Sequence, residues 1–89
     1  MIITADISMY PLDADFIEPI TRFIVALREY SGLDVVTNQL STQVRGEFDV
    51  VAAALNDCMH NAMSEGSKVV FVTKYLNSDL DIAELPQLD

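Results

Sequence analysis

Residues 33–48 read LDVVTNQLSTQVRGEF. The runs 33–38 and 41–48 are rich in residues that favour strands, and only a short segment separates them. Two such runs joined by a connection of this length are typical of a β-hairpin. The stretch therefore predicts two antiparallel strands with Asn38, Gln39 and Leu40 at their turn, and the elements on either side of the hairpin decide the fold.

A segment with helical spacing lies on each side of the hairpin. Residues 13–32 carry apolar side chains at intervals of three and four, which predicts a helix that Gly32 ends. Residues 48–66 show the same spacing and end at Gly66. The apolar stripes consist of Phe16, Ile20, Phe23, Ile24 and Leu27 in the first helix and of Val51, Leu55, Cys58 and Ala62 in the second.

Strands are predicted near both ends of the chain. Residues 2–10 alternate between apolar and polar side chains, and Pro11 stops this strand because it has no N–H to donate. Residues 68–76 carry bulky apolar groups on both faces, as strands that are buried on both sides do. We therefore expect one domain over residues 1–76 and an acidic C-terminal tail over residues 77–89 that frays or lies over the surface.

The element order βαββαβ predicts an α+β fold of the ferredoxin-like class. Such a fold has a four-stranded antiparallel sheet with two helices on one face, and the first and third strands are central. Packing against a second sheet would cover the apolar part of the opposite face and leave its polar part as a pocket wall. The helices would cover Ile3, Ala5, Ile7 and Met9, whereas the opposite face would carry Thr4, Asp6, Ser8 and Tyr10 beside either Ser41, Gln43, Arg45 and Glu47 or their neighbours.

Composition narrows the classes of function. The 89 residues include five Lys and Arg against fourteen Asp and Glu, a net charge of -9. Nucleic acids and anionic membranes are bound through basic patches, so neither is an expected partner. The charge suits a neutral or cationic ligand, although acidity also serves solubility. A core this small is marginal while 51% of the residues are apolar, which favours oligomerisation.

Cysteine content and the N-terminal segment indicate the compartment. The single cysteine, Cys58, excludes an internal disulfide and a CxxC site. The N-terminal segment lacks the charged and apolar regions of a signal peptide, and no apolar run reaches the roughly 20 residues that span a bilayer. We expect a cytoplasmic protein.

Three stretches together resemble the YkoF-type thiamine- and hydroxymethylpyrimidine-binding family. They are ISMYPL (7–12), TNQLSTQVRGEFDVV (37–51) and VVFVTKYL (69–76), and the similarity extends over residues 2–76. The resemblance implies a ferredoxin-like fold. It also implies a protein that binds thiamine or its pyrimidine moiety in uptake or supply of the vitamin, and that is not an enzyme. With one copy of the domain, the chain resembles the single-domain members, which implies a homodimer or homotetramer formed through the sheet face.

The chemistry of this ligand matches the polar residues of the predicted sheet face. An aminopyrimidine needs an acceptor for its amine and partners for its ring nitrogens, and a cationic thiazolium is stabilised by carboxylates and aromatic faces. The resemblance implies that the hairpin segment 37–43 forms the pocket together with Ser8 and Tyr10 of the first strand. No cofactor and no metal is expected. The candidate ligand-binding residues are Asp6, Ser8, Tyr10, Thr37, Asn38, Ser41, Thr42, Gln43 and Glu47.

Each candidate also has a purely structural interpretation. Residues 41–42 suit a strand, Asn38 is typical of turns, and Glu47 stands where a carboxylate favours the start of a helix. Asp is depleted in strand interiors, so Asp6 is harder to explain in this way, unless it pairs with Arg45 on the adjacent strand.

Other functions suit the same fold. An ACT-like regulatory domain would bind an amino acid at an oligomer interface, and glycine-rich turns after the first strand would favour it. The loop PLDADF (11–16) has no glycine, and it lacks the arginine of an acylphosphatase-type site. His60 stands on a solvated helix face, and the sequence shows no nucleophile–base pair. A purely structural subunit is the remaining alternative.

Overall fold

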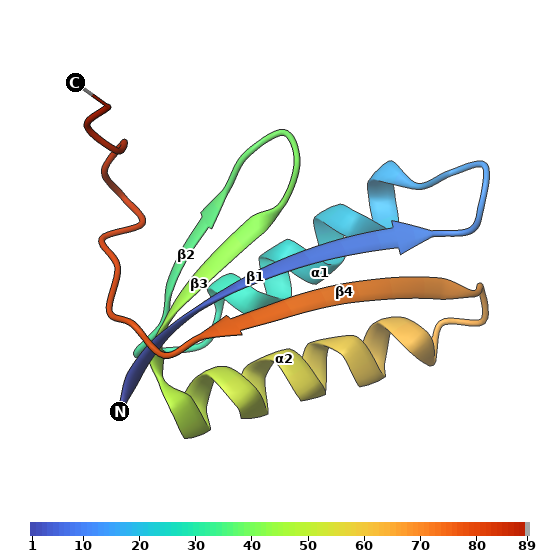
Figure 1. Ribbon diagram of the computed structural model, residues 1–89. Coiled ribbons are helices and arrows are strands. Elements are labelled where there is room, and N and C mark those ends of the chain that lie inside the picture. The colour runs from blue at the N-terminus through green and yellow to red at the C-terminus, as the bar shows by residue number, and fades with distance from the viewer. Residues whose placement is uncertain (89) are drawn as a thin grey trace.

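The computed structural model describes residues 1–88 and has the element order βαββαβ (Figure 1). The sheet order is β2-β3-β1-β4, and every neighbouring pair is antiparallel. Both helices cover one face of the sheet, which confirms the predicted ferredoxin-like α+β class. The elements are β1 (Ile2–Pro11), α1 (Ile17–Arg28), β2 (Asp34–Thr37), β3 (Thr42–Glu47), α2 (Phe48–Met63) and β4 (Val69–Leu76).

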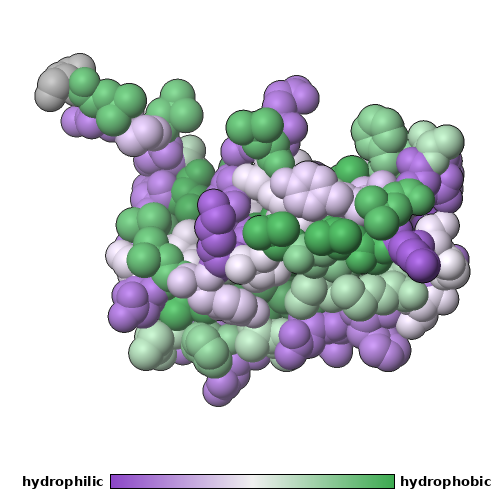
Figure 2. Space-filling view, turned by 45° about the vertical axis from the view of Figure 1, so that its right-hand side comes forward, coloured by the Kyte–Doolittle hydropathy of each residue, from purple (hydrophilic) through white to green (hydrophobic). Residues whose placement is uncertain are grey.

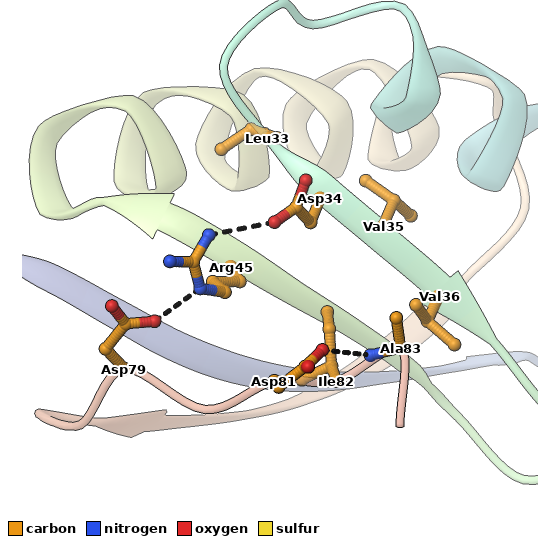
Figure 3. A pocket seen from close by; sticks show the side chains of 9 residues that line it. All are labelled: Leu33, Asp34, Val35, Val36, Arg45, Asp79, Asp81, Ile82 and Ala83. Carbon is orange, nitrogen blue, oxygen red and sulfur yellow. Dashed lines mark hydrogen bonds and ion pairs between the residues drawn. The ribbon is translucent and has the colours of Figure 1, made fainter. Parts of the chain in front are cut away.

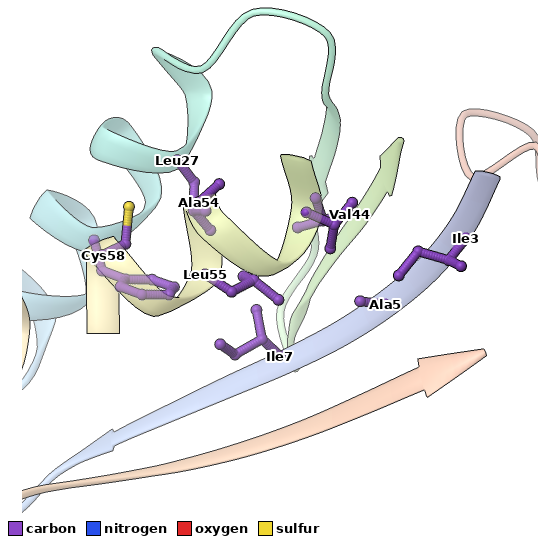
Figure 4. Close-up of a cluster of buried hydrophobic side chains, with 10 residues drawn as sticks. Ile3, Ala5, Ile7, Leu27, Val44, Ala54, Leu55 and Cys58 are labelled. Carbon is purple, nitrogen blue, oxygen red and sulfur yellow. The ribbon is translucent and has the colours of Figure 1, made fainter. Parts of the chain in front are cut away.

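The core lies between the sheet and the two helices (Figure 4). The apolar face of β1 points into it, as the alternation predicts, and each fully buried aliphatic side chain contributes about 1.5–3 kcal/mol. Phe16 is exposed because it precedes the first helical residue of α1, so that stripe begins later than predicted. The buried residues are Ile3, Ala5, Ile7, Phe23, Leu27, Val44, Val51, Ala54, Leu55 and Cys58.

Gly46 allows the turn between α1 and β2 to lie directly against β3. A Cβ atom at this position would stand 2.7 Å from Leu33 Cδ2 and 2.9 Å from the carbonyl oxygen of Gly32. Gly32 has a φ of 83°. Only glycine takes such an angle without strain, so the chain reverses here before β2 begins.

The second face of the sheet, which we call the open face, carries no helix. Directly opposite residues of an antiparallel pair share a face, so the register places Gln43 beside Asp6 and Arg45 beside Thr4. Of the two sets of neighbours that the sequence left open, Gln43 and Arg45 are therefore the ones on this face. Two rows cross all four strands, namely Asp34–Arg45–Thr4–Leu76 and Val36–Gln43–Asp6–Lys74.

Part of the open face consists of exposed apolar side chains. Val70 and Val72 of β4 are 46% and 47% exposed, although their strand was expected to be buried on both faces. Tyr10, opposite Val70, is exposed as well. In a view turned from that of Figure 1, strongly apolar side chains form a patch bordered by hydrophilic ones (Figure 2). Within residues 1–88, no helix has the length and apolar character needed to cross a membrane.

The first part of the C-terminal tail folds back over the open face. The hydroxyl of Thr4 donates to the carbonyl oxygen of Ser78 at 2.8 Å and accepts from the backbone N–H of Leu80 at 3.1 Å. Arg45 donates from Nε to the carboxylate of Asp79. These contacts hold residues 78–80 against β1 and β3, and the chain then runs on beside β2 (Figure 1).

Candidate ligand-binding site

Asp6, in the middle of β1, is the centre of a polar cluster on the open face. Its Oδ1 accepts hydrogen bonds from Ser41 Oγ at 2.7 Å and from Gln43 Nε2 at 3.0 Å. Gln43 Nε2 also lies 2.9 Å from Ser41 Oγ. The hairpin places Ser41 and Gln43 beside β1, so three of the predicted residues meet at one point. We call these three residues the Asp6 cluster.

Arg45 does not pair with Asp6, so that alternative interpretation is wrong. Arg45 lies opposite Thr4, one row away, and its Nη1 donates to Asp34 at 2.9 Å while Nε donates to Asp79. These two bonds raise the pKa of Arg45 above its ordinary value, with the Asp79 bond the larger cause. The same bond lowers the pKa of Asp79. The guanidinium therefore joins β2 and β3 to the tail.

A pocket of about 680 Å³ lies between β2 and the tail (Figure 3). Its size is that of pockets that take small organic molecules. The pocket adjoins the Asp6 cluster, because Val36 in its wall lies directly opposite Gln43. We call it the tail pocket, and its walls are formed by Leu33, Asp34, Val35, Val36, Arg45, Asp79, Asp81, Ile82 and Ala83.

The tail pocket was not predicted from the sequence. Asp79 and Asp81 belong to a segment without periodic structure, and nothing in its pattern says which strand it contacts. The sequence contains one chemical indication of this contact. Arg45 is an arginine in a strand of an acidic chain, and the acidic tail supplies carboxylates that can pair with it.

Asn38 has the turn role that its structural interpretation expects. Its Oδ1 accepts from the backbone N–H groups of Leu40 at 2.9 Å and Ser41 at 3.0 Å. Its Nδ2 lies 3.4 Å from Gln43 Oε1. Asn38 therefore stabilises the turn that positions Ser41 in the Asp6 cluster.

Thr37 and Thr42 lie on the other face of the hairpin. Thr42 is opposite Ile7, whose side chain is in the core, and Thr42 is itself buried. The hydroxyls of Thr37 and Thr42 are 3.0 Å apart and line a separate cavity of about 120 Å³ between the hairpin and α1. Ser8, Asn38 and Ser41 line the same cavity, so it brings five of the predicted residues together and meets the Asp6 cluster at Ser41.

The remaining candidates lie farther along the strands. Ser8 follows Asp6 on the same face of β1, which places it beside the cluster, whereas Tyr10 is four residues from Asp6, about 13 Å along the strand. Glu47 is equally distant from Gln43 on β3, and it accepts from the N-terminal amine of Met1 at 2.9 Å just before α2. Among residues 1–88, no group of three His, Cys, Asp or Glu is placed to hold a metal ion.

Comparison with known proteins agrees with this architecture. The profile of the YKOF-related family matches residues 2–78. None of the curated proteins compared with the chain matches it. Among solved structures, a Streptococcus pneumoniae protein is 21% identical with a TM-score of 0.78, and the match covers 93% of this chain and 94% of that one.

Two further structures are similar over most of their length. A hypothetical protein from Methanocaldococcus jannaschii is 22% identical with a TM-score of 0.77, over 88% of this chain and 81% of that one. A Thermotoga maritima protein, whose name assigns it provisionally to thiamine biosynthesis or salvage, is 18% identical with a TM-score of 0.75, over 97% of this chain and 90% of that one. At these identities the likeness shows a shared fold.

Proposed function

Since this chain belongs to the YKOF-related family, we propose that it binds thiamine or its hydroxymethylpyrimidine moiety without converting it. The binding would serve supply, transport or sensing of the vitamin. The thiamine-related name of the Thermotoga maritima protein with the same fold supports this choice of ligand. The observation that carries the proposal is the Asp6 cluster, because its groups match the edge of an aminopyrimidine.

The pyrimidine ring would lie on the Asp6 cluster. Its exocyclic amine would donate to Asp6, and the amide of Gln43 would donate to a ring nitrogen with the N–H that otherwise points at Ser41 Oγ. Both intramolecular bonds to Asp6 reach Oδ1, so the amine would approach Oδ2. A bond between a neutral donor and a carboxylate stabilises a complex by about 1.5–3 kcal/mol, more than a neutral pair does.

The thiazolium ring of thiamine would occupy the tail pocket, one row away. Its positive charge would be close to the carboxylates of Asp34 and Asp81, and its apolar edge would contact Val36 and Ile82. Thiamine would thus span both parts of the open face, whereas the isolated pyrimidine would use only the Asp6 cluster. We therefore expect thiamine to bind more tightly than hydroxymethylpyrimidine.

A second subunit would also cover part of the open face, in a homodimer or in a homotetramer. Val70, Val72 and Tyr10 are exposed on the part of the open face that lies beyond the Asp6 cluster. Their burial by a second copy would offset the small core of a single chain. Val72→Lys should then yield monomers in light scattering, whereas Val25→Lys, at a valine of similar exposure on α1, should leave the oligomer intact.

Calorimetry of the purified protein tests the proposed ligand. Thiamine and hydroxymethylpyrimidine should each release or absorb heat on binding, and each should raise the melting temperature. The function would be wrong if neither compound gave a heat or a thermal shift at millimolar concentration. If a panel of amino acids displaced thiamine, the ACT-like alternative would become the better account.

A further inference from the structure

Arg45 is placed where the anionic group of a ligand would be bound. Arg22 and Arg28 lie on α1, so within residues 1–88 Arg45 is the arginine of the open face. It lines the tail pocket, and it is two residues from Gln43 on the same face of β3. A guanidinium binds phosphate through two parallel N–H donors, which makes arginine the usual residue for recognising phosphate esters.

The guanidinium is already occupied by two carboxylates of the chain (Figure 3). Asp34 accepts from Nη1, and Asp79 accepts from Nε. The two acids differ in origin, because Asp34 belongs to β2 while Asp79 belongs to the tail. The tail is held in place independently of Arg45, through the two hydrogen bonds of Thr4 to Ser78 and Leu80. The bonds of Thr4 therefore hold the tail in the position where the carboxylate of Asp79 contacts Nε of Arg45.

We propose that Asp79 is a specificity-determining residue, which occupies the anion position at Arg45 and thereby excludes phosphate esters of the ligand. This inference rests on the proposed function and assigns the form of the ligand that the site accepts. A phosphate at this position has to displace Asp79 and then stands close to the carboxylates of Asp34 and Asp81. Unphosphorylated thiamine meets no such repulsion, because its charge is positive.

The test compares thiamine with thiamine monophosphate on the full chain by calorimetry. Asp79→Asn removes the negative charge at Arg45 with little change of shape. Glu84→Gln is the matched control, since it makes the same change of charge in the exposed tail, and Glu84 is not among the residues that form the walls of the tail pocket. The wild type should prefer thiamine at least tenfold, Asp79→Asn should reduce this preference about tenfold, and Glu84→Gln should change it less than threefold. Equal effects of the two variants would overturn the inference.

A second measurement does not depend on thiamine binding. The Nε–H signal of Arg45 is followed by NMR while inorganic phosphate is added, and Arg45→Lys identifies the signal. In Asp79→Asn the signal should shift at millimolar phosphate, whereas in the wild type and in Glu84→Gln it should not. If no protein binds thiamine but this pattern holds, the proposed function fails, and what stands is that Asp79 occupies the anion position at Arg45. If Asp79→Asn is folded by circular dichroism and its signal does not respond to phosphate, the role of Asp79 is wrong.

Discussion

Replacing Gly46 by alanine should destabilise the fold, because the added Cβ would clash with the turn between α1 and β2. The added Cβ would stand 2.7 Å from Leu33 Cδ2 and 2.9 Å from the carbonyl oxygen of Gly32, whereas ordinary contacts begin at 3.4 Å. The side chain of Leu33 can turn away, but the backbone oxygen can move only with the whole turn. Overpacking of this kind costs about 1–3 kcal/mol in the free energy of unfolding.

Urea titration and thermal unfolding measure this cost. Each kcal/mol should lower the melting temperature of a chain this size by about 4–8 °C. Gly66→Ala is the contrasting variant, because nothing lies within 4 Å of its added Cβ and only its φ of 100° opposes alanine. Chemical shifts near Leu33 should change in Gly46→Ala and not in Gly66→Ala. A Gly46→Ala protein whose urea midpoint equals that of the wild type would rule out this clash.

Three further predictions follow from the core and the tail. Leu55→Ala should lower the free energy of unfolding by about 2–5 kcal/mol in urea titration, because the side chain is fully buried. Burial raises the pKa of the Cys58 thiol, so at pH 8 iodoacetamide should modify Cys58 no faster than the chain unfolds, and rapid labelling of the native protein would contradict this. Arg45 lowers the pKa of Asp79 below its ordinary value of 3.8, so their contact should be intact above that pH and lost as the pH falls through the lowered pKa. The NMR signal of Arg45 Nε–H should shift when this contact is lost. A shift of this signal between pH 7 and pH 5 would contradict the prediction.

The architecture could be predicted because it depends on periodicity. The alternation in 2–10 and the helical spacing in 13–32 and 48–66 each fix which side chains face the core, and the structure confirms the element order. The start of α1 could not be predicted as well, because no side chain caps it and apolar residues continue into the preceding loop.

The candidate site was harder to predict, because it depends on register and on contacts without a pattern. Moving a strand by one residue exchanges its two faces, so the sequence alone did not decide whether Ser41 or Thr42 would join Asp6. The structure places Ser41 there and turns Thr42 toward the helices. The contact of Asp79 with Arg45 joins residues 34 positions apart through an irregular segment, and no spacing rule describes it.

Calorimetry with thiamine on Asp6→Asn tests whether Asp6 receives the aminopyrimidine of the ligand. Asp15→Asn, with the same change of charge in the loop before α1, is the control. We expect Asp6→Asn to weaken binding at least tenfold, because a charge-assisted hydrogen bond is lost, and Asp15→Asn to bind as the wild type does. Thiamine binding of equal strength in wild type, Asp6→Asn and Asp15→Asn would contradict this expectation.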